Sequence, residues 1–434
     1  MSAETLALSS IAAIGDRPWL SNAMFGFTKW GNPFAEERFS SPYPMYERMR
    51  GDGPVVYSRV FRQWFVFGYD EIHEVLRSPD TATSPVADLM LSTRQYRKLT
   101  PSAQTNFARW LLATDPPDHT RLRSAVSRAF TPKQIALYEH LVRNTVDELL
   151  AGLPESGDVD IVEAFTNKLP IQVIAELLGL PRDRRDWLLQ TSREIGAILE
   201  PMSTFDPELL STRFAELDDF FLDLIEQRRR LPGSDLISAI VVAGDGPILD
   251  DDEIVAMITF LLFAGHETVT GVLGNSLVAL EANPDQRELL RERPELIDNA
   301  IEELLRFDAP VQMSGRQATA ELHIGGVTIP KGANVALMIG AANRDTRRWT
   351  DANELRLDRP DPKAISFGFG AHHCLGAALA RMELRLAIPA MLAVLGDYTI
   401  DADRTTWKRS FGLRGPLALN ITSSATTHHG SVAP

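Results

Sequence analysis

The ten residues from 367 to 376 (Phe-Gly-Phe-Gly-Ala-His-His-Cys-Leu-Gly) constrain this chain more than any other stretch. They contain Cys374, the only cysteine among 434 residues, which therefore cannot form an intramolecular disulfide. Three glycines in the segment permit positive φ angles and the close approach of a bulky planar group. Strong helix formers follow at residues 377–384, so Cys374 lies where a glycine-rich loop enters a helix. Free N–H groups and the positive end of the helix dipole favour an anion there, in this case a thiolate.

This pattern, F-x-x-G-x-H-x-C-x-G before a helix, resembles the haem-ligand loop of the cytochrome P450 monooxygenases. The resemblance implies that Cys374 is the axial ligand of a haem b iron, where a thiolate favours cleavage of the O–O bond. A buried structural cysteine is the commoner fate of a lone free Cys and is the alternative interpretation. The presence of all five spaced positions favours the haem site.

Composition limits the other possibilities. The apolar fraction (44%) and charged fraction (24%) are those of a soluble globular protein. A net charge of −14 argues against binding to nucleic acid through bulk charge. A single cysteine fits a reducing compartment. Residues 1–20 lack the pattern of a signal peptide, and no stretch reaches the roughly 18 consecutive apolar residues of a membrane span. We therefore expect a cytoplasmic protein without a membrane span.

The resemblance implies one large, mainly α domain of the cytochrome P450 type, with a minor β-sheet region, over residues 41–422. An N-terminal arm (residues 1–40) precedes it, and a disordered tail (residues 423–434) follows. Helices are predicted for residues 45–50, 70–77, 131–153, 160–178, 181–199 and 207–230. Short strands are predicted for residues 55–58, 64–67, 322–324, 327–329 and 335–338. Residues 79–117 show little periodicity and predict a long loop, which by resemblance covers the distal pocket.

Four residues are candidates for binding the haem propionates. His119 and Arg123 are four residues apart on one face of a predicted helix. A solvated basic face would give the same spacing, but the family has an H-x-x-x-R pair here that donates to propionates. The resemblance adds Arg316, whose planar guanidinium suits a carboxylate, and His372.

A second motif lies in a predicted helix that runs from about residue 250 to 280. It is apolar on nearly every face before Ala264-Gly265-His266-Glu267-Thr268, and a helix of that kind is buried all round. Thr268 can bond back to the Ala264 carbonyl, and Gly265 permits a local widening of the helix. A polar patch facing solvent is the alternative. A zinc site of the H-E-x-x-H type is excluded because position 270 is Thr.

The segment resembles the A-G-x-D/E-T element of the family. The resemblance assigns Ala264 to the cofactor site, and Glu267 and Thr268 to an acid–alcohol pair that delivers protons. Five apolar residues are expected to line the substrate pocket: Met257, Phe260, Leu261, Val311 and Met313.

A structural motif supports the same assignment. Glu303 and Arg306 form an E-x-x-R pair, which alone is very weak. In the family this pair is buried and joined by a later arginine, here Arg359. Leu355 and Leu357 depart from the pattern, because aromatic residues are typical at those positions.

These features together predict a haem-thiolate monooxygenase that inserts one atom of O₂ into an apolar small molecule. Electrons would come from a separate ferredoxin or flavodoxin with its NAD(P)H reductase, because no flavin, iron–sulfur or dinucleotide motif is present. A basic docking patch for that partner is expected at Arg121, Arg128, Lys363, Arg381 and Arg385. The alternatives are a peroxide-driven peroxygenase, a non-catalytic haem carrier or sensor, and a cysteine-nucleophile hydrolase.

Overall fold

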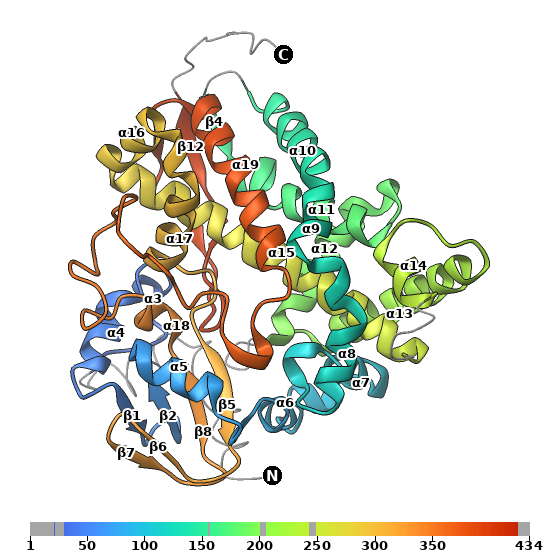
Figure 1. The fold of residues 1–434 in the computed structure, drawn as a ribbon, viewed down its shortest axis with the longest axis horizontal. Coiled ribbons are helices and arrows are strands. Elements are labelled where there is room, and N and C mark those ends of the chain that lie inside the picture. Colours follow the sequence, from blue (N-terminus) through green and yellow to red (C-terminus); the bar gives the residue numbers. More distant parts are fainter. Residues whose placement is uncertain (1–20, 22–29, 155–156, 200–204, 243–248, 424–434) are drawn as a thin grey trace.

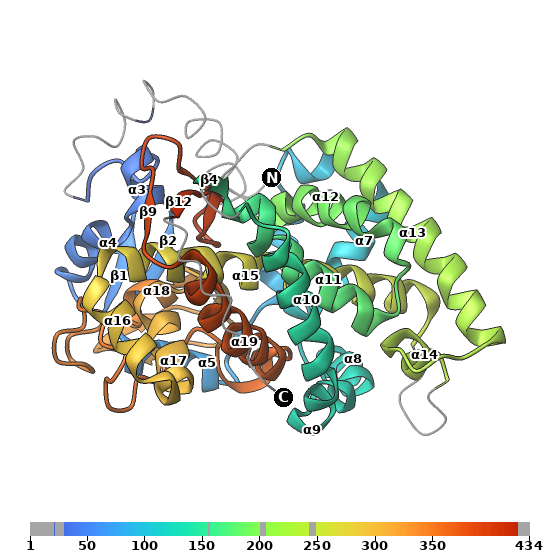
Figure 2. The ribbon, with the colours of Figure 1, turned by 90° about the horizontal axis from the view of Figure 1, so that it is seen from above.

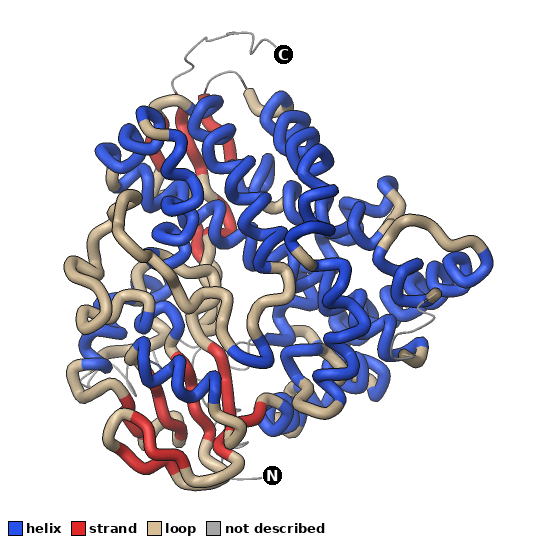
Figure 3. The backbone as a smooth tube through the Cα atoms, viewed as in Figure 1, coloured by secondary structure: helices blue, strands red, loops and turns tan. Residues whose placement is uncertain are grey.

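The computed structural model describes residues 21, 30–154, 157–199, 205–242 and 249–423, which form a predominantly helical molecule. Figure 1 and the colouring of Figure 3 show strands in one corner and in a narrow band near the top, with helices elsewhere. The predicted mainly α fold with a minor β region is confirmed.

The larger sheet contains five strands in the order β1-β2-β8-β5-β3. They are β1 (Val55–Ser58), β2 (Gln63–Val66), β3 (Thr81–Ala82), β5 (Ser314–Ala318) and β8 (Asn334–Leu337). The predicted hairpin is present as β1 and β2, with Val55 opposite Val66. β2 pairs in parallel with β8 and brings Trp64 beside Val335. On its other side β8 pairs with β5, which fixes the position of Arg316.

The remaining strands of the described chain form a three-stranded sheet and two hairpins. The sheet has the order β4-β12-β9 and consists of β4 (Gly157–Asp160), β9 (Tyr398–Ile400) and β12 (Asn420–Ser423). The hairpins are β6 (Leu322–Ile324) with β7 (Val327–Ile329), and β10 (Thr406–Trp407) with β11 (Pro416–Ala418). Ile421 in β12 is fully buried between Val159 and Ile400 on the two neighbouring strands.

Longer helices build most of the molecule, and the predicted helices are present with short breaks. The first are α4 (Tyr43–Arg50), α5 (Tyr69–Arg77), α6 (Ser84–Leu91), α7 (Pro101–Ala108), α8 (Asp118–Ser127) and α10 (Glu139–Ala151). They are followed by α11 (Lys168–Leu178), α12 (Arg185–Gly196), α13 (Pro207–Arg230), α15 (Asp251–Ala282), α16 (Pro284–Glu292), α17 (Ile297–Phe307) and α19 (Ala377–Leu395).

Short helical segments connect these elements. The α-helical ones are α3 (Glu36–Ser40), α9 (Pro132–Ile135), α14 (Leu236–Val241) and α18 (Ile339–Ala342). One π-helical segment is η5 (Val162–Thr166). The 3-10 segments are η1 (Tyr96–Lys98), η2 (Leu111–Ala113), η3 (Arg128–Phe130), η4 (Ala136–Tyr138), η6 (Arg182–Arg184), η7 (Ala197–Leu199), η8 (Pro294–Leu296) and η9 (Gly370–His372).

Helix α15 crosses the middle of the molecule, as Figure 2 shows. It begins with a capping box, in which the Asp250 carboxylate accepts from the Glu253 N–H at 2.8 Å and the Glu253 carboxylate accepts from the Asp250 N–H at 3.0 Å. By length and composition α15 could cross a membrane, but 78% of its apolar window is buried inside the protein. It is therefore the core helix that its apolar sequence predicts.

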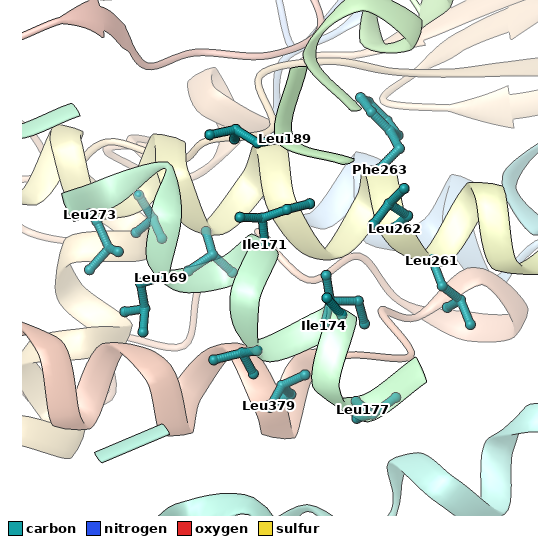
Figure 4. Close-up of a cluster of buried hydrophobic side chains, with 14 of the residues drawn as sticks. Leu169, Ile171, Ile174, Leu177, Leu189, Leu261, Leu262, Phe263, Leu273 and Leu379 are labelled. Carbon is teal, nitrogen blue, oxygen red and sulfur yellow. The ribbon is translucent and has the colours of Figure 1, made fainter. Parts of the chain in front are cut away.

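The core around α15 explains why the neighbouring helices have fixed positions. Figure 4 shows α11 lying between α15 and α19, with Leu169, Ile171 and Ile174 directed into the contact. All three side chains are at most 2% exposed. Burial of one such side chain contributes about 1.5–3 kcal/mol. Packing of this kind connects the helix that carries Glu267 to the helix that follows Cys374.

Two expectations at the level of the fold are wrong. Residues 79–117 are not a long loop, because they contain β3, the eight-residue helices α6 and α7, and the short segments η1 and η2. Their helical periods are too short to stand out in the sequence. The tail was expected to begin at residue 423, but Ser423 belongs to β12. The rest of the predicted tail, and most of the predicted N-terminal arm, lie outside the described residues.

Candidate functional site

The cysteine loop has the local structure that its glycines predict. Gly368 and Gly370 have φ angles of +67° and +72°, which side chains other than glycine rarely adopt. A Cβ at Gly370 would also lie 2.5 Å from the carbonyl oxygen of Leu76 in α5. The Cys374 N–H donates to the Phe367 carbonyl at 2.8 Å, which closes the loop three residues before α19 begins.

The thiol of Cys374 is subject to opposing effects. Burial raises its pKa, whereas the Gly376 N–H and the charges of Arg123 and Arg381 act to lower it. The net effect is a raised pKa. A cysteine nucleophile of a hydrolase requires a lowered pKa. A bound metal ion deprotonates the thiol on its own account, which makes this environment suitable for a metal ligand.

The four predicted propionate ligands come together beside this loop. His119 and His372 are in ring contact, with centroids 4.2 Å apart. Burial, Arg316 and His119 lower the pKa of His372 to about 3, with Arg123 adding to the effect and Asp115 opposing it. Burial is also the main reason that the pKa of Arg316 is lowered to about 10.

This cluster has more donors than it has acceptors. The Nε2 of His119 is buried and makes no hydrogen bond within the described structure. Within the described residues, the Arg316 side chain donates to Ser314 Oγ and to the Gly315 carbonyl. Asp115 lies 3.7 Å from His372, but its carboxylate already accepts hydrogen bonds from residues 83 and 84. Two additional carboxylates, such as the propionates of a haem, would accept hydrogen bonds from these donors. The residues present therefore fit that cofactor.

Helix α15 leaves one row of side chains accessible. Between residues 254 and 277 the residues with partial exposure are Phe260, Ala264, Gly265 and Thr268, and three of them are spaced by four residues. The Thr268 hydroxyl donates to the Ala264 carbonyl at 2.9 Å, as expected. The helix is regular at Gly265, so the expected widening is absent there. The glycine instead leaves room for Ile174, which would lie 3.2 Å from a Cβ at this position.

Glu267 is buried and forms an ion pair with Lys408, which follows strand β10. Its carboxylate also lies 3.8 Å from Nδ1 of His266, and that nitrogen makes a 3.0 Å hydrogen bond with Ser192 Oγ in α12. Sequence reasoning missed Lys408, since it is 141 residues from Glu267 and belongs to no motif.

The predicted substrate-pocket residues do not form a single group. Phe260 belongs to the accessible row of α15, whereas Met257 and Leu261 are buried in the core. Val311 is partly exposed and pairs with Leu413 through an isolated β-bridge. Met313 lines an apolar hollow beside the larger sheet, together with Met45, Phe65, Met338 and Phe411 among others.

The E-x-x-R motif forms the predicted buried triad. Glu303, Arg306 and Arg359 are at most 4% exposed. Arg306 donates to the two Glu303 carboxylate oxygens at 2.6 and 2.8 Å, and Arg359 Nε lies 3.0 Å from Oε1. The departure at Leu355 and Leu357 does not disturb this arrangement, because both leucines are buried in the core.

The predicted basic docking patch is largely neutralised. Ion pairs link Arg121 to Glu253, Lys363 to Asp361, Arg381 to Glu302 and Arg385 to Asp298. The positive charge of this surface is therefore lower than the sequence alone predicts.

Comparison with known proteins gives a consistent result. Residues 62–395 match the family model of cytochrome P450. The chain is 35% identical over 405 residues to a vitamin D(3) 25-hydroxylase of Pseudonocardia autotrophica, covering 92% of this chain and 96% of the relative. It is also 35% identical to 6-deoxyerythronolide B hydroxylase of Saccharopolyspora erythraea, covering 86% and 94% of the two chains. The crystal structure of CalO2 matches with a TM-score of 0.85 and 30% identity, covering 92% of this chain and all of that one.

Proposed function

The chain belongs to the cytochrome P450 family as a monooxygenase, and from that membership we propose a haem b enzyme that hydroxylates an apolar natural product or steroid-like molecule. The observation that carries the proposal is the cluster of His119, Arg123, Arg316 and His372, which has a buried ring nitrogen without a hydrogen-bond partner in the described structure, beside the Cys374 loop. The cluster lacks hydrogen-bond acceptors. A cofactor that bears two carboxylates and binds next to the Cys374 thiol would supply them.

Each residue at the site has a distinct role in this proposal. Cys374 would ligate the haem iron, and the four basic residues of the cluster would bind the propionates. When bound, the haem supplies the activation of O₂. The Thr268 hydroxyl donates to the Ala264 carbonyl and retains its acceptor lone pairs for a water molecule at the reaction site. The Glu267 carboxylate accepts a proton and passes it to that water.

The substrate class follows from the relatives and from the accessible side chains. One relative is named for vitamin D(3) and another for 6-deoxyerythronolide B. Phe260 and Ala264 present an apolar surface next to Thr268, which suits a substrate bound mainly by shape and apolar contact. We therefore propose a polycyclic or macrocyclic apolar substrate, with Val311 as a further lining residue.

A separate ferredoxin or flavodoxin with its NAD(P)H reductase is proposed as the electron donor, with both proteins in the cytoplasm. Because ion pairs reduce the charge of the predicted patch, we expect docking to depend on shape as well as on Arg381 and Arg385.

The test of the proposed function is the carbon monoxide spectrum of the reduced protein. Ligation by Cys374 predicts a strongly red-shifted absorption band, and Cys374→Ser should abolish it. A preparation that takes up no haem, or a Cys374→Ser variant with an unchanged spectrum, would contradict the proposal. Screening apolar natural products for a shift of the Soret band would then identify the substrate.

Measurements of turnover can distinguish two alternative functions from the proposed one. A peroxygenase would work with peroxide alone and would not need the Glu267–Thr268 pair. In a carrier or sensor, Thr268→Ala should leave the behaviour of the protein unchanged. In a monooxygenase, the same variant should consume reductant without forming an equivalent amount of product.

A further inference from the structure

An apolar hollow lies beside the larger sheet, apart from the site around Cys374. Four methionines line it, namely Met45 and Met49 of α4, Met313 and Met338. None of the described residues that line it belongs to α15 or to the loop at residues 367–376. The hollow encloses about 560 Å³ of space between atoms, part of which is open to solvent. It is therefore a candidate binding site that is separate from the proposed reaction site.

Two arginines flank one edge of this hollow, at Gly31. A Cβ on Gly31, which lines the hollow, would lie 3.0 Å from Nη2 of Arg38 and 4.0 Å from Nη2 of Arg48. Arg38 belongs to α3 and Arg48 to α4, and Figures 1 and 2 show these two helices next to each other. Because both guanidinium groups approach the same point, a single anion can bridge them.

Neither arginine forms an ion pair with any residue that the structure describes. The Nε of Arg38 is buried and donates no hydrogen bond within that part of the chain. Burial, followed by the charge of Arg48, lowers the pKa of Arg38, whereas Glu37 acts to raise it. The two positive charges therefore oppose each other, and an anion bound between them would compensate for both.

Nearby acidic side chains do not supply that anion. Glu36 lies 3.3 Å from Arg409, and Asp52 accepts a hydrogen bond from the Trp30 indole at 2.9 Å. Glu37 is exposed and does not approach either arginine to ion-pair distance. Within the described residues, the position between the two arginines therefore has no counter-charge.

The hollow continues into a smaller pocket on the side of Arg38. Pro33, Met45 and Phe411 line both spaces, and Arg38 lines the smaller one. An apolar chain can therefore lie in the hollow while its headgroup meets the arginines. Methionine side chains are flexible and polarizable, so they can adapt to chains of different shape. Charge and shape together fit an amphiphile with a negative headgroup.

We propose that this hollow is a second ligand site, which binds an amphiphile with an anionic headgroup. The headgroup, the carboxylate of a fatty acid or the phosphate of a lipid, lies between Arg38 and Arg48. The apolar chain packs against Met45, Met49 and Met338, which are at most 6% exposed. The site binds its ligand whether or not the reaction site is occupied, so it can be tested with the reaction pocket filled.

The experiment is a calorimetric titration of the ferric holoenzyme, whose reaction pocket is first filled with an azole that ligates the iron. The Soret band of the same sample shows that the azole stays bound. Dodecanoate and dodecyl phosphate should bind, and the tighter of the two identifies the headgroup. Dodecyltrimethylammonium, which has the same chain and the opposite charge, should not bind. Added salt should weaken the binding of the anionic probes, because exposed charges are screened.

Variants of the two arginines test the headgroup position. Arg38→Gln and Arg48→Gln should each weaken the binding of the tighter probe about three- to tenfold, because each removes a charge-assisted hydrogen bond at a partly exposed site. The double variant should weaken it further. Arg184→Gln is the matched control, since Arg184 is an exposed arginine of η6 that does not line the hollow; it should leave binding unchanged.

The position of the chain is read from the resonances of isotope-labelled methionine methyl groups, assigned with Met45→Leu and Met338→Leu. Addition of the tighter probe should shift the resonances of Met45 and Met338. Absence of binding heat in the azole-filled protein, equal affinity for the cationic probe, or unchanged affinity in the double variant would each overturn the inference. So would shifts confined to methionines outside the hollow.

Discussion

The buried triad provides the most demanding test of the structural interpretation. In Arg306→Met, Glu303 keeps Arg359 but loses two charge-assisted hydrogen bonds, and the carbonyls of Asn343 and Ala352 lose donors at 2.9 and 2.7 Å. Removing one partner of a buried ion pair costs about 3–5 kcal/mol. Each unsatisfied carbonyl adds about 1–3 kcal/mol, less where water can enter. We expect a loss of at least about 4 kcal/mol from a total stability of about 5–15 kcal/mol.

Urea unfolding at 25 °C, followed by tryptophan fluorescence, measures this loss. Trp349 is a local reporter, since the Arg306 guanidinium lies 5.5 Å from its ring centroid. The control is Arg143→Met, which removes an exposed pair with Glu139 at 2.8 Å and should cost less than about 0.5 kcal/mol. Arg306→Lys keeps the charge but not the forked geometry and should lie in between. Equal losses in Arg306→Met and Arg143→Met would refute the argument that burial determines the contribution.

Three further predictions address other parts of the molecule. Glu383 has a raised pKa when folded and an ordinary value of 4.5 when unfolded, so its contribution to stability is full below pH 4.5 and is lost as pH rises toward the folded pKa. Glu383→Gln should abolish this loss of about 1.4 kcal/mol per pH unit, and equal pH slopes in thermal melts of the two proteins would contradict it. Gly271→Ala should cost about 1–3 kcal/mol by clashing with the β10–β11 hairpin, whereas Gly152→Ala, a control at an open helix end, should stay within about 0.5 kcal/mol in the same melts. Charge reversal of Arg381 and Arg385 should slow reduction by the electron donor most at low salt, and stopped-flow rates that are unchanged would exclude this surface from docking.

The elements that could be predicted are those whose structure follows from a motif or pattern in the sequence. Helix α15 was predicted because a continuous apolar pattern follows a run of acids that caps it, and the structure contains that cap. The loop around Cys374 was predicted because its glycines occur where positive φ angles are needed. The pairing of Glu303, Arg306 and Arg359 was expected from the order of motifs, and the hydrogen bonds are present.

Features that depend on distant contacts could not be predicted in this way. Lys408 meets Glu267 only because the β10–β11 hairpin crosses α15, which no local pattern specifies. The hollow lined by Met313 could not be predicted, because Met45, Phe65 and Phe411 reach it from distant parts of the sequence. Helices α6 and α7 were missed because each contains only about two turns and begins at or next to a proline. The neutralisation of the basic patch was missed because each acid partner is remote or irregularly spaced.

Strand β12 has a consequence for how this protein is made in the cell. β4 at residues 157–160 and β9 at residues 398–400 have β12 as their shared partner, so the edges of both strands stay open until residues 420–423 leave the ribosome. The helical core can fold during synthesis, but the β4-β12-β9 sheet can pair completely only after translation has passed residue 423. Chains stopped before residue 420 expose two unpaired strand edges and are expected to aggregate, and any tag fused downstream needs a spacer that leaves β12 free to pair.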